Sequence, residues 1–168
     1  AAAVEIARRY RPKLVLVGRS PLPPETEPED TAALTSQSEI KAALIGRAER
    51  DGGAATPAQI QAEYAALLRD REIRNTLGRI RTAGARVEYH SLDVRDAEAF
   101  GELIRRVDAQ CGGIDGVVHG AGVIDDKLVK DKTPESFDRV FNTKVASAAT
   151  LARDLNPQKL KFFVMFSS

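Results

Sequence analysis

The chain has 168 residues, of which 43% are hydrophobic and 29% are charged, and its formal net charge is +1. This length suits one domain with its own core, the nearly balanced charge argues against a nucleic-acid binder, and no apolar stretch approaches the roughly 18 residues of a membrane span. Cys111 is the single cysteine and there are only two histidines, so we expect no disulfide, no metal site and a reducing, cytoplasmic setting.

The first half of the sequence predicts a short α/β segment followed by helices. Helix-forming residues at 1–10 stop before Pro12, and the apolar run 14–17, rich in branched side chains, predicts a buried strand. Residues 21–35 contain four prolines and are expected to form a loop. Helices are expected after it at about 36–50 and 57–83.

A strong start signal precedes the second of these helices. Thr56 can cap it, Pro57 takes the first helical position, Gln59 can bond back to the cap, and Gly84 is placed to end it. The helix carries an apolar stripe that must be buried against the core or a neighbouring domain. The stripe consists of Ile60, Tyr64, Leu67 and Leu68. We expect 21–83 to form a peripheral helical insertion between the second and third strands of the fold.

From Arg86 onward, strands and helices alternate. Strands are expected at 87–92, 114–119 and 160–166, with helices from Asp96 to about 110 and from Thr133 to about 155. This alternation predicts an α/β fold, a Rossmann-like doubly wound parallel sheet with helices on both faces. Ligands of such sheets bind at the carboxyl ends of the strands. The polar segments that follow strands are Gly18-Arg19-Ser20, Asp93-Val94, the His119 turn and Ser167-Ser168.

Several of these segments resemble motifs of the ketoreductase domains of type I polyketide synthases, in the short-chain dehydrogenase/reductase superfamily. Residues 118–123, Val-His-Gly-Ala-Gly-Val, resemble the H-x-A-G-V turn that packs against the cofactor ribose. Gly and Ala leave room there for a cofactor to approach the backbone. His119 is expected to orient the turn rather than to act as an acid or base.

Two further segments resemble the part of the family site that binds the adenosine end of the cofactor. Residues 92–96, Leu-Asp-Val-Arg-Asp, resemble the D-V-x-D segment, whose first Asp meets the adenine amino group. Gly18-Arg19-Ser20 resembles the G-R-S that selects NADPH, since an arginine fork suits the 2′-phosphate. The resemblance implies that NADPH is bound by Gly18, Arg19, Ser20, Asp93, Val94, His119, Gly120, Ala121 and Gly122.

Residues 131–145 resemble the T-P-E helix of these ketoreductases, which carries the active-site lysine. The resemblance assigns that lysine to Lys144. Ser168 lies twenty-four residues later, the family spacing to the serine of F-S-S, and is implied to be the second catalytic residue. The resemblance covers 1–20 and 84–168. The long insertion resembles the ketoreductases of iterative synthases, including the polyunsaturated-fatty-acid type.

Two family motifs are expected outside the sequence. The glycine-rich T-G-x-x-x-G-x-G loop and the strand before it should precede Ala1, and the catalytic Y-x-x-x-N should follow Ser168. That strand is central in a 3-2-1-4-5 sheet, and each buried backbone group left unpaired without it costs about 1–3 kcal/mol. We therefore expect a sheet that is incomplete at both ends and a chain that is part of a larger polypeptide.

The resemblance implies NADPH-dependent reduction of a β-ketoacyl group on an acyl carrier protein to the β-hydroxyacyl group, during polyketide or fatty-acid synthesis. Other synthase domains are the expected further partners. The family tyrosine would donate the proton, Ser168 would hydrogen-bond the ketone oxygen, and the charge of Lys144 would lower the pKa of the tyrosine. Two alternatives remain: a non-catalytic structural domain with the cofactor fold, and another nicotinamide-dependent reductase or epimerase of the superfamily.

Residues 123–126, Val-Ile-Asp-Asp, resemble the L-D-D fingerprint of ketoreductases that form the D (3R) alcohol. A loop at the site entrance can decide which ketone face meets the hydride, because a difference of about 1.4 kcal/mol gives a tenfold bias. The alternative is that Asp125 and Asp126 merely solvate a turn.

Overall fold

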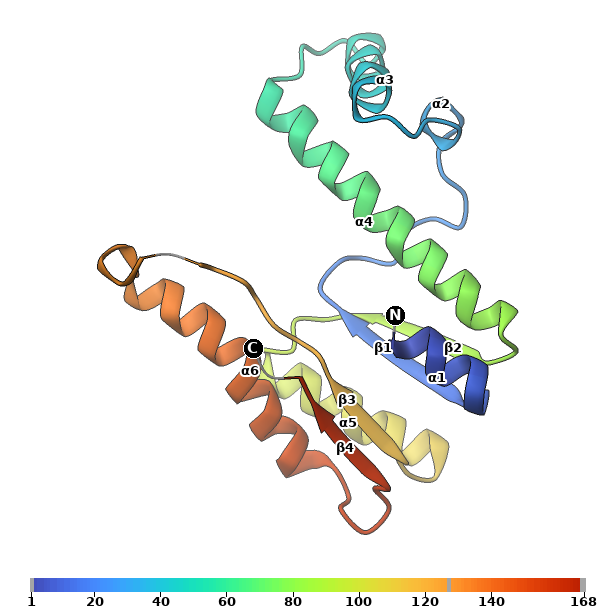
Figure 1. Ribbon diagram of the computed structural model, residues 1–168, viewed down its shortest axis with the longest axis vertical. Helices are drawn as coiled ribbons and strands as arrows, with labels where there is room; N and C mark the ends of the chain where they lie inside the picture. The colour runs from blue at the N-terminus through green and yellow to red at the C-terminus, as the bar shows by residue number, and fades with distance from the viewer. Residues whose placement is uncertain (1, 127, 167–168) are drawn as a thin grey trace. The chain divides into compact units, whose positions relative to one another are not determined.

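The computed structural model describes residues 2–126 and 128–166. It divides into two compact units, Ala1–Leu16 with Ser20–Ser91, and Val17–Arg19 with Leu92–Ser168. Figure 1 labels the α-helices and strands. In chain order the elements are α1 (Ala2–Tyr10), β1 (Lys13–Gly18), α2 (Glu29–Ala32), α3 (Gln37–Arg50), α4 (Pro57–Thr82), β2 (Arg86–Ser91), α5 (Ala97–Cys111), β3 (Gly116–His119), the 3-10 turn η1 (Val129–Asp131), which has no label in the figure, α6 (Pro134–Asp154) and β4 (Phe162–Met165).

In the first unit, β1 pairs with β2, and α1 and the C-terminal part of α4 pack beside them. The centre of this packing is fully or nearly fully buried and is built from Val4, Ala7, Ile80 and Ala85. Leu14 and Leu16 of β1 pack against it, as expected for an apolar run of branched residues. The last turns of α4 therefore belong to the α/β core, whereas its first half does not.

The first half of α4 packs on α3 and forms a small helical core of its own. Ile60 contacts Ile40 and Leu44, and Tyr64 and Leu67 pack around them. The apolar stripe of α4 is thus covered largely by α3 of the same insertion. The remaining member of the stripe, Leu68, stays 41% exposed.

The predicted cap of α4 is confirmed. The Gln59 N–H donates to the Thr56 hydroxyl at 3.3 Å and the Thr56 N–H donates to the Gln59 side-chain oxygen at 2.8 Å. The preceding loop differs from the prediction, since it contains the one-turn helix α2. Its acidic residues pair with arginines of later helices, and these pairs hold the turn in place.

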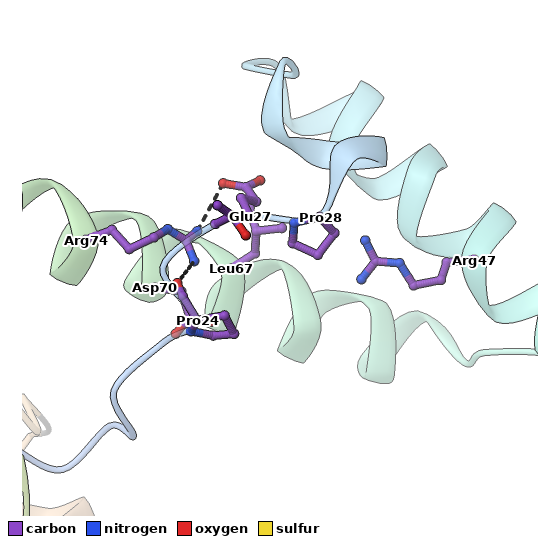
Figure 2. Close-up of a pocket in the computed structure, with 8 residues that line it drawn as sticks. Pro24, Glu27, Pro28, Arg47, Leu67, Asp70 and Arg74 are labelled. Atoms are coloured by element: carbon purple, nitrogen blue, oxygen red, sulfur yellow. Dashed lines mark hydrogen bonds and ion pairs between the residues drawn. The ribbon is translucent and has the colours of Figure 1, made fainter.

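A charge network connects α2 and the segment before it to α4, and Figure 2 shows the ion pair between Glu27 and Arg74. The Glu27 carboxylate accepts from Arg71 at 2.7 Å and from Arg74 at 3.1 Å, and its side chain is only 10% exposed. Arg71 also donates to the main-chain oxygen of Thr31 at 2.7 Å. The hydrogen bond from Arg71 is the largest cause that lowers the pKa of Glu27. The network also borders a pocket lined by Pro24, Thr26, Glu27, Pro28, Arg47, Leu67, Asp70 and Arg74.

In the second unit, β3 and β4 pair in parallel, with Val118 opposite Val164. Helices α5 and α6 pack on each other, and Phe100 and Ile104 of α5 meet Leu151 of α6 in a buried cluster. The sequence places both helix starts correctly. Asp96 accepts from the Ala99 N–H and Thr133 from the Ser136 N–H, and left-handed Gly112, with φ of 72°, ends α5.

The α/β, Rossmann-like fold class is confirmed, with strands arranged as two pairs, β1–β2 and β3–β4. Across residues 2–126 and 128–166 no strand joins the two pairs. Within the same residues no helix is long and apolar enough to cross a membrane.

Candidate functional site

A backbone hydrogen bond joins the ends of β1 and β2. The Leu92 N–H donates to the Gly18 carbonyl oxygen at 2.8 Å. Arg19 and Asp93 each follow directly on this bonded pair in the chain. Two of the predicted cofactor-binding segments, 18–19 and 93–94, are therefore held next to each other within the second unit.

The carboxylate of Asp93 is clamped by Arg95. The Arg95 guanidinium donates to both oxygens, at 2.6 Å in the shortest contact, and the Arg95 N–H donates at 3.0 Å. These bonds are the main cause that lowers the pKa of Asp93, and the charge of Arg19 adds a smaller contribution in the same direction. Two arginines thus act on one carboxylate, so these three side chains at the ends of β1 and β2 carry a net positive charge.

Val94 and Ser20 have different surroundings. Val94 packs against the cluster around Phe100, so it anchors the turn after β2 to the core of the second unit. Ser20 belongs to the first unit, where its carbonyl oxygen accepts from the Tyr89 hydroxyl at 2.7 Å. Burial raises the pKa of that tyrosine. Ser20 therefore contributes a backbone contact that fixes the end of its own segment.

His119 ends β3 and is 6% exposed. Its Nε2 lies 3.2 Å from the carbonyl oxygen of Lys144 and 3.1 Å from the hydroxyl of Ser147. Its own carbonyl oxygen accepts from the Phe166 N–H at 3.0 Å. One residue thereby links β3 to both α6 and the end of β4.

Lys144 lies on α6 and reaches the end of β4. Its Nζ donates to the Phe166 carbonyl oxygen at 3.2 Å. Its Cε passes Gly122 so closely that a Cβ there would lie 3.3 Å away. Ser168 lies outside the described residues, two positions beyond Phe166 in the chain.

The turn after β3 supplies the predicted glycines. Gly120, Ala121 and Gly122 follow His119 directly. A Cβ at Gly120 would lie 3.7 Å from the Phe166 ring, an ordinary contact, whereas one at Gly122 would crowd Lys144. Gly122 therefore leaves space on the same side as the lysine that the sequence singles out.

A contact between α6 and the loop after β3, which contains Asp125, was not predicted from the sequence. The Ser136 hydroxyl donates to the Asp125 carboxylate at 3.0 Å, and Arg139 forms an ion pair with the same oxygen. Asp125 is therefore an anchor rather than a residue that merely solvates a turn, whereas Asp126 is exposed. A serine at the third position of a capped helix, facing an acidic loop, is the signal that could have indicated this contact.

Among the described residues, no cluster of three or more His, Cys, Asp or Glu could hold a metal ion. The family model for the KR domain matches residues 1–168 of the chain. The chain belongs to the KR, or ketoreductase, domain family. The resemblance to polyketide-synthase ketoreductases, which the sequence carries over 1–20 and 84–168, is thereby confirmed at the level of the family.

Individual relatives support the same assignment. A polyunsaturated fatty acid synthase polypeptide of Thraustochytrium sp. is 33% identical over 162 residues, 93% of the KR chain. A solved ketoreductase domain from the bacillaene assembly line is 26% identical, with a TM-score of 0.64, over 99% of the KR chain. A short-chain dehydrogenase from Mycobacterium paratuberculosis, solved bound to NAD, is 18% identical with a TM-score of 0.56 over 94% of it, a likeness of fold alone.

The KR chain covers only a small share of each of these proteins. It spans 6% of the Thraustochytrium synthase polypeptide, 29% of the bacillaene ketoreductase chain and 44% of the Mycobacterium dehydrogenase. The activities, substrates and partners of these whole proteins can therefore only be proposed for this KR domain.

Proposed function

We propose that this KR domain takes part in the NADPH-dependent reduction of a β-ketoacyl group on an acyl carrier protein to the β-hydroxyacyl group, in polyketide or fatty-acid chain synthesis. The observation that carries the proposal is the position of Lys144. Its ammonium lies 3.2 Å from the carbonyl oxygen of Phe166, which follows β4 and comes two residues before Ser168. A lysine that reaches the residue two positions before Ser168 in the chain is consistent with the lysine–serine pair of the ketoreductases that the sequence resembles.

The described residues fit a nicotinamide cofactor. Residues 120–122 form a turn with small or absent side chains, which lets a planar or phosphorylated group approach the backbone. At the other end, Arg19 and Arg95 both act on the carboxylate of Asp93, and this balance favours NADPH, with its additional 2′-phosphate, over NADH. When bound, NADPH supplies the hydride.

The remaining roles belong to side chains of this chain. Ser168 donates a hydrogen bond to the ketone oxygen, where negative charge develops. Lys144 stabilises the ionised form of the family tyrosine through its positive charge, which keeps the proton of that tyrosine available. Gly18, Ser20 and Val94 hold the cofactor segments through their backbone and packing contacts.

The proposal includes a setting for the domain. The acyl carrier protein and other synthase domains are its partners, the compartment is the cytoplasm, and 21–83 is a peripheral helical insertion that stays outside the cofactor site. The covering of the first half of α4 by α3 supports this last point for that part of the insertion, whereas the last turns of α4 pack in the α/β core.

The test is a reduction assay with the full polypeptide that carries this chain. With NADPH and an acetoacetyl thioester, we expect NADPH oxidation and formation of the 3-hydroxybutyryl thioester. Cofactor binding without any turnover would favour the non-catalytic structural domain. Turnover of other substrates, with no turnover of β-ketoacyl thioesters, would favour another reductase or epimerase of the superfamily.

A further inference from the structure

The buried face of α6 is formed mainly by hydroxyl side chains. The buried residues of this helix are Ser136, Thr143, Ser147, Thr150 and Leu151. Three of the hydroxyls donate back to carbonyl oxygens four residues earlier along the helix. One of these three, Ser147, also contacts another element, because its hydroxyl lies 3.1 Å from Nε2 of the buried His119. The face of α6 near Lys144 is thus joined to β3 by polar groups.

The directions of these bonds follow from the available protons. The Ser147 hydroxyl has one proton, and its shortest contact is to the carbonyl oxygen of Thr143. The carbonyl oxygen of Lys144, 3.2 Å from Nε2, can only accept. Nε2 of His119 must therefore carry a proton and donate, shared between the Lys144 carbonyl oxygen and the Ser147 hydroxyl.

These contacts close a cycle of three residues. The His119 ring donates to the carbonyl oxygen of Lys144, Nζ of Lys144 donates to the carbonyl oxygen of Phe166, and the Phe166 N–H donates to the carbonyl oxygen of His119. Lys144 is consequently held at both ends, at its main chain by His119 and at its ammonium by the strand that His119 pairs with.

We propose that His119 and Ser147 are positioning residues for Lys144, with the hydrogen-bond cycle through Phe166 fixing where the ammonium lies at the end of β4. The inference rests on the proposed role of Lys144 in reduction. A mutation far from the reacting atoms that misplaces a catalytic group by about 1 Å can lower the rate about a hundredfold. Loosening the main-chain contact therefore acts on turnover and leaves substrate and cofactor binding nearly unchanged.

The experiment compares four variants of the full polypeptide. His119→Leu removes the donor and keeps an apolar side chain, whereas His119→Gln keeps an N–H donor at a similar reach. Ser147→Ala removes the bridging hydroxyl. Thr150→Val is its matched control, because Thr150 is also buried on α6 and donates in the same way, to the carbonyl oxygen of Ala146 on its own helix.

We expect His119→Leu to lower kcat about 10- to 100-fold with KM within about threefold of wild type, and Ser147→Ala to keep NADPH affinity within about threefold of wild type. His119→Gln should restore most of that loss, Ser147→Ala should lower kcat severalfold, and Thr150→Val should not. If His119→Leu does not fold, the gap between Ser147→Ala and Thr150→Val decides. Equal kcat in Ser147→Ala and Thr150→Val, or wild-type kcat in a folded His119→Leu, would overturn the proposal.

Lys144→Ala, assayed in parallel, separates this proposal from the function beneath it. A wild-type kcat in Lys144→Ala would mean that the proposed function of Lys144 is wrong. A slow Lys144→Ala beside fast His119→Leu and Ser147→Ala would mean that only the positioning role is wrong.

Discussion

A Cβ atom at Gly122 would lie 3.3 Å from Cε of Lys144, closer than the 3.5–4.0 Å or so at which carbon atoms pack. We therefore expect Gly122→Ala to push the lysine arm aside and to lower kcat by about 2- to 10-fold. Steady-state kinetics of the full polypeptide with NADPH and an acetoacetyl thioester give the measurement.

Gly120→Ala is the matched control, since its Cβ would lie 3.7 Å from the Phe166 ring, without crowding. It should leave kcat closer to wild type than Gly122→Ala does. If both variants lose NADPH affinity equally and keep kcat, the turn acts on the cofactor alone and the contact with Lys144 has no consequence for turnover.

Arg19→Ala should weaken NADPH binding by about 1.5–3 kcal/mol, the range for a hydrogen bond to a charged group, and should leave NADH binding nearly unchanged. The reason is that the arginine fork suits the 2′-phosphate, which NADH lacks. Fluorescence titration with each cofactor measures the difference. Arg106→Ala, which removes an exposed arginine of α5, should change neither affinity. An equal loss for both cofactors would contradict the assignment of Arg19.

Much of the fold was accessible from the sequence because caps and apolar runs are local signals. Thr56, Asp96 and Thr133 were each expected to begin a helix, and each accepts a hydrogen bond from the helix it begins. The one-turn helix α2 was missed, since four residues are too few for periodicity to appear. It depends instead on contacts such as the bond from Arg71 to the Thr31 carbonyl oxygen, formed across forty residues.

The sequence places the proposed site at the strand ends but does not predict the hydrogen bonds within it. Asp93 is a predicted site residue, yet its bonds with Arg95 depend on the geometry of the turn between them. The contact of His119 with Ser147 joins residues twenty-eight positions apart. The composition of α6 also gives no signal for this contact, because the apolar Phe137 is 56% exposed while the polar Ser147 is fully buried. Apolar periodicity alone would therefore select the wrong face of this helix.

Lys144→Ala and Ser168→Ala should each lower kcat strongly while NADPH affinity stays within about threefold of wild type, since both residues are proposed to act in the transition state. Single-turnover reduction of an acetoacetyl thioester isolates the chemical step. Lys130→Ala serves as the control, because this lysine lies on the η1 turn and is not assigned to the site. Near-normal turnover in either of the first two variants would remove that residue from the proposed mechanism.

Glu27→Gln should loosen the attachment of α2 to α4. The carboxylate of Glu27 pairs with Arg71 and Arg74, and losing the charged hydrogen bonds should cost about 1–3 kcal/mol of local stability at neutral pH. The folded pKa of Glu27 is lowered from 4.5, so its contribution is complete above that value and is lost as the pH falls through the folded pKa.

Hydrogen exchange of the amides in α2 and α4 measures this local stability. Wild type should be better protected than Glu27→Gln at neutral pH, and the difference should shrink well below the ordinary value of 4.5. Glu25→Gln makes the same chemical change at an exposed residue of the same segment and should have little effect. A difference that persists unchanged in acid would show that packing, not charge, holds the segment.

Asp125 ties the loop after β3 to α6 through Ser136 and Arg139, and this anchor gives the loop a fixed path along the proposed site entrance. We expect the wild-type enzyme to form the D (3R) alcohol and Asp125→Ala to lose selectivity, because about 1.4 kcal/mol of differential contact is enough for a tenfold bias. Asp126→Ala, at the neighbouring exposed carboxylate, should keep the wild-type ratio. Chiral analysis of the 3-hydroxybutyryl product gives the outcome. A clean L alcohol from wild type would refute the stereochemical assignment, and an unchanged ratio in Asp125→Ala would show that the anchored loop does not select the ketone face.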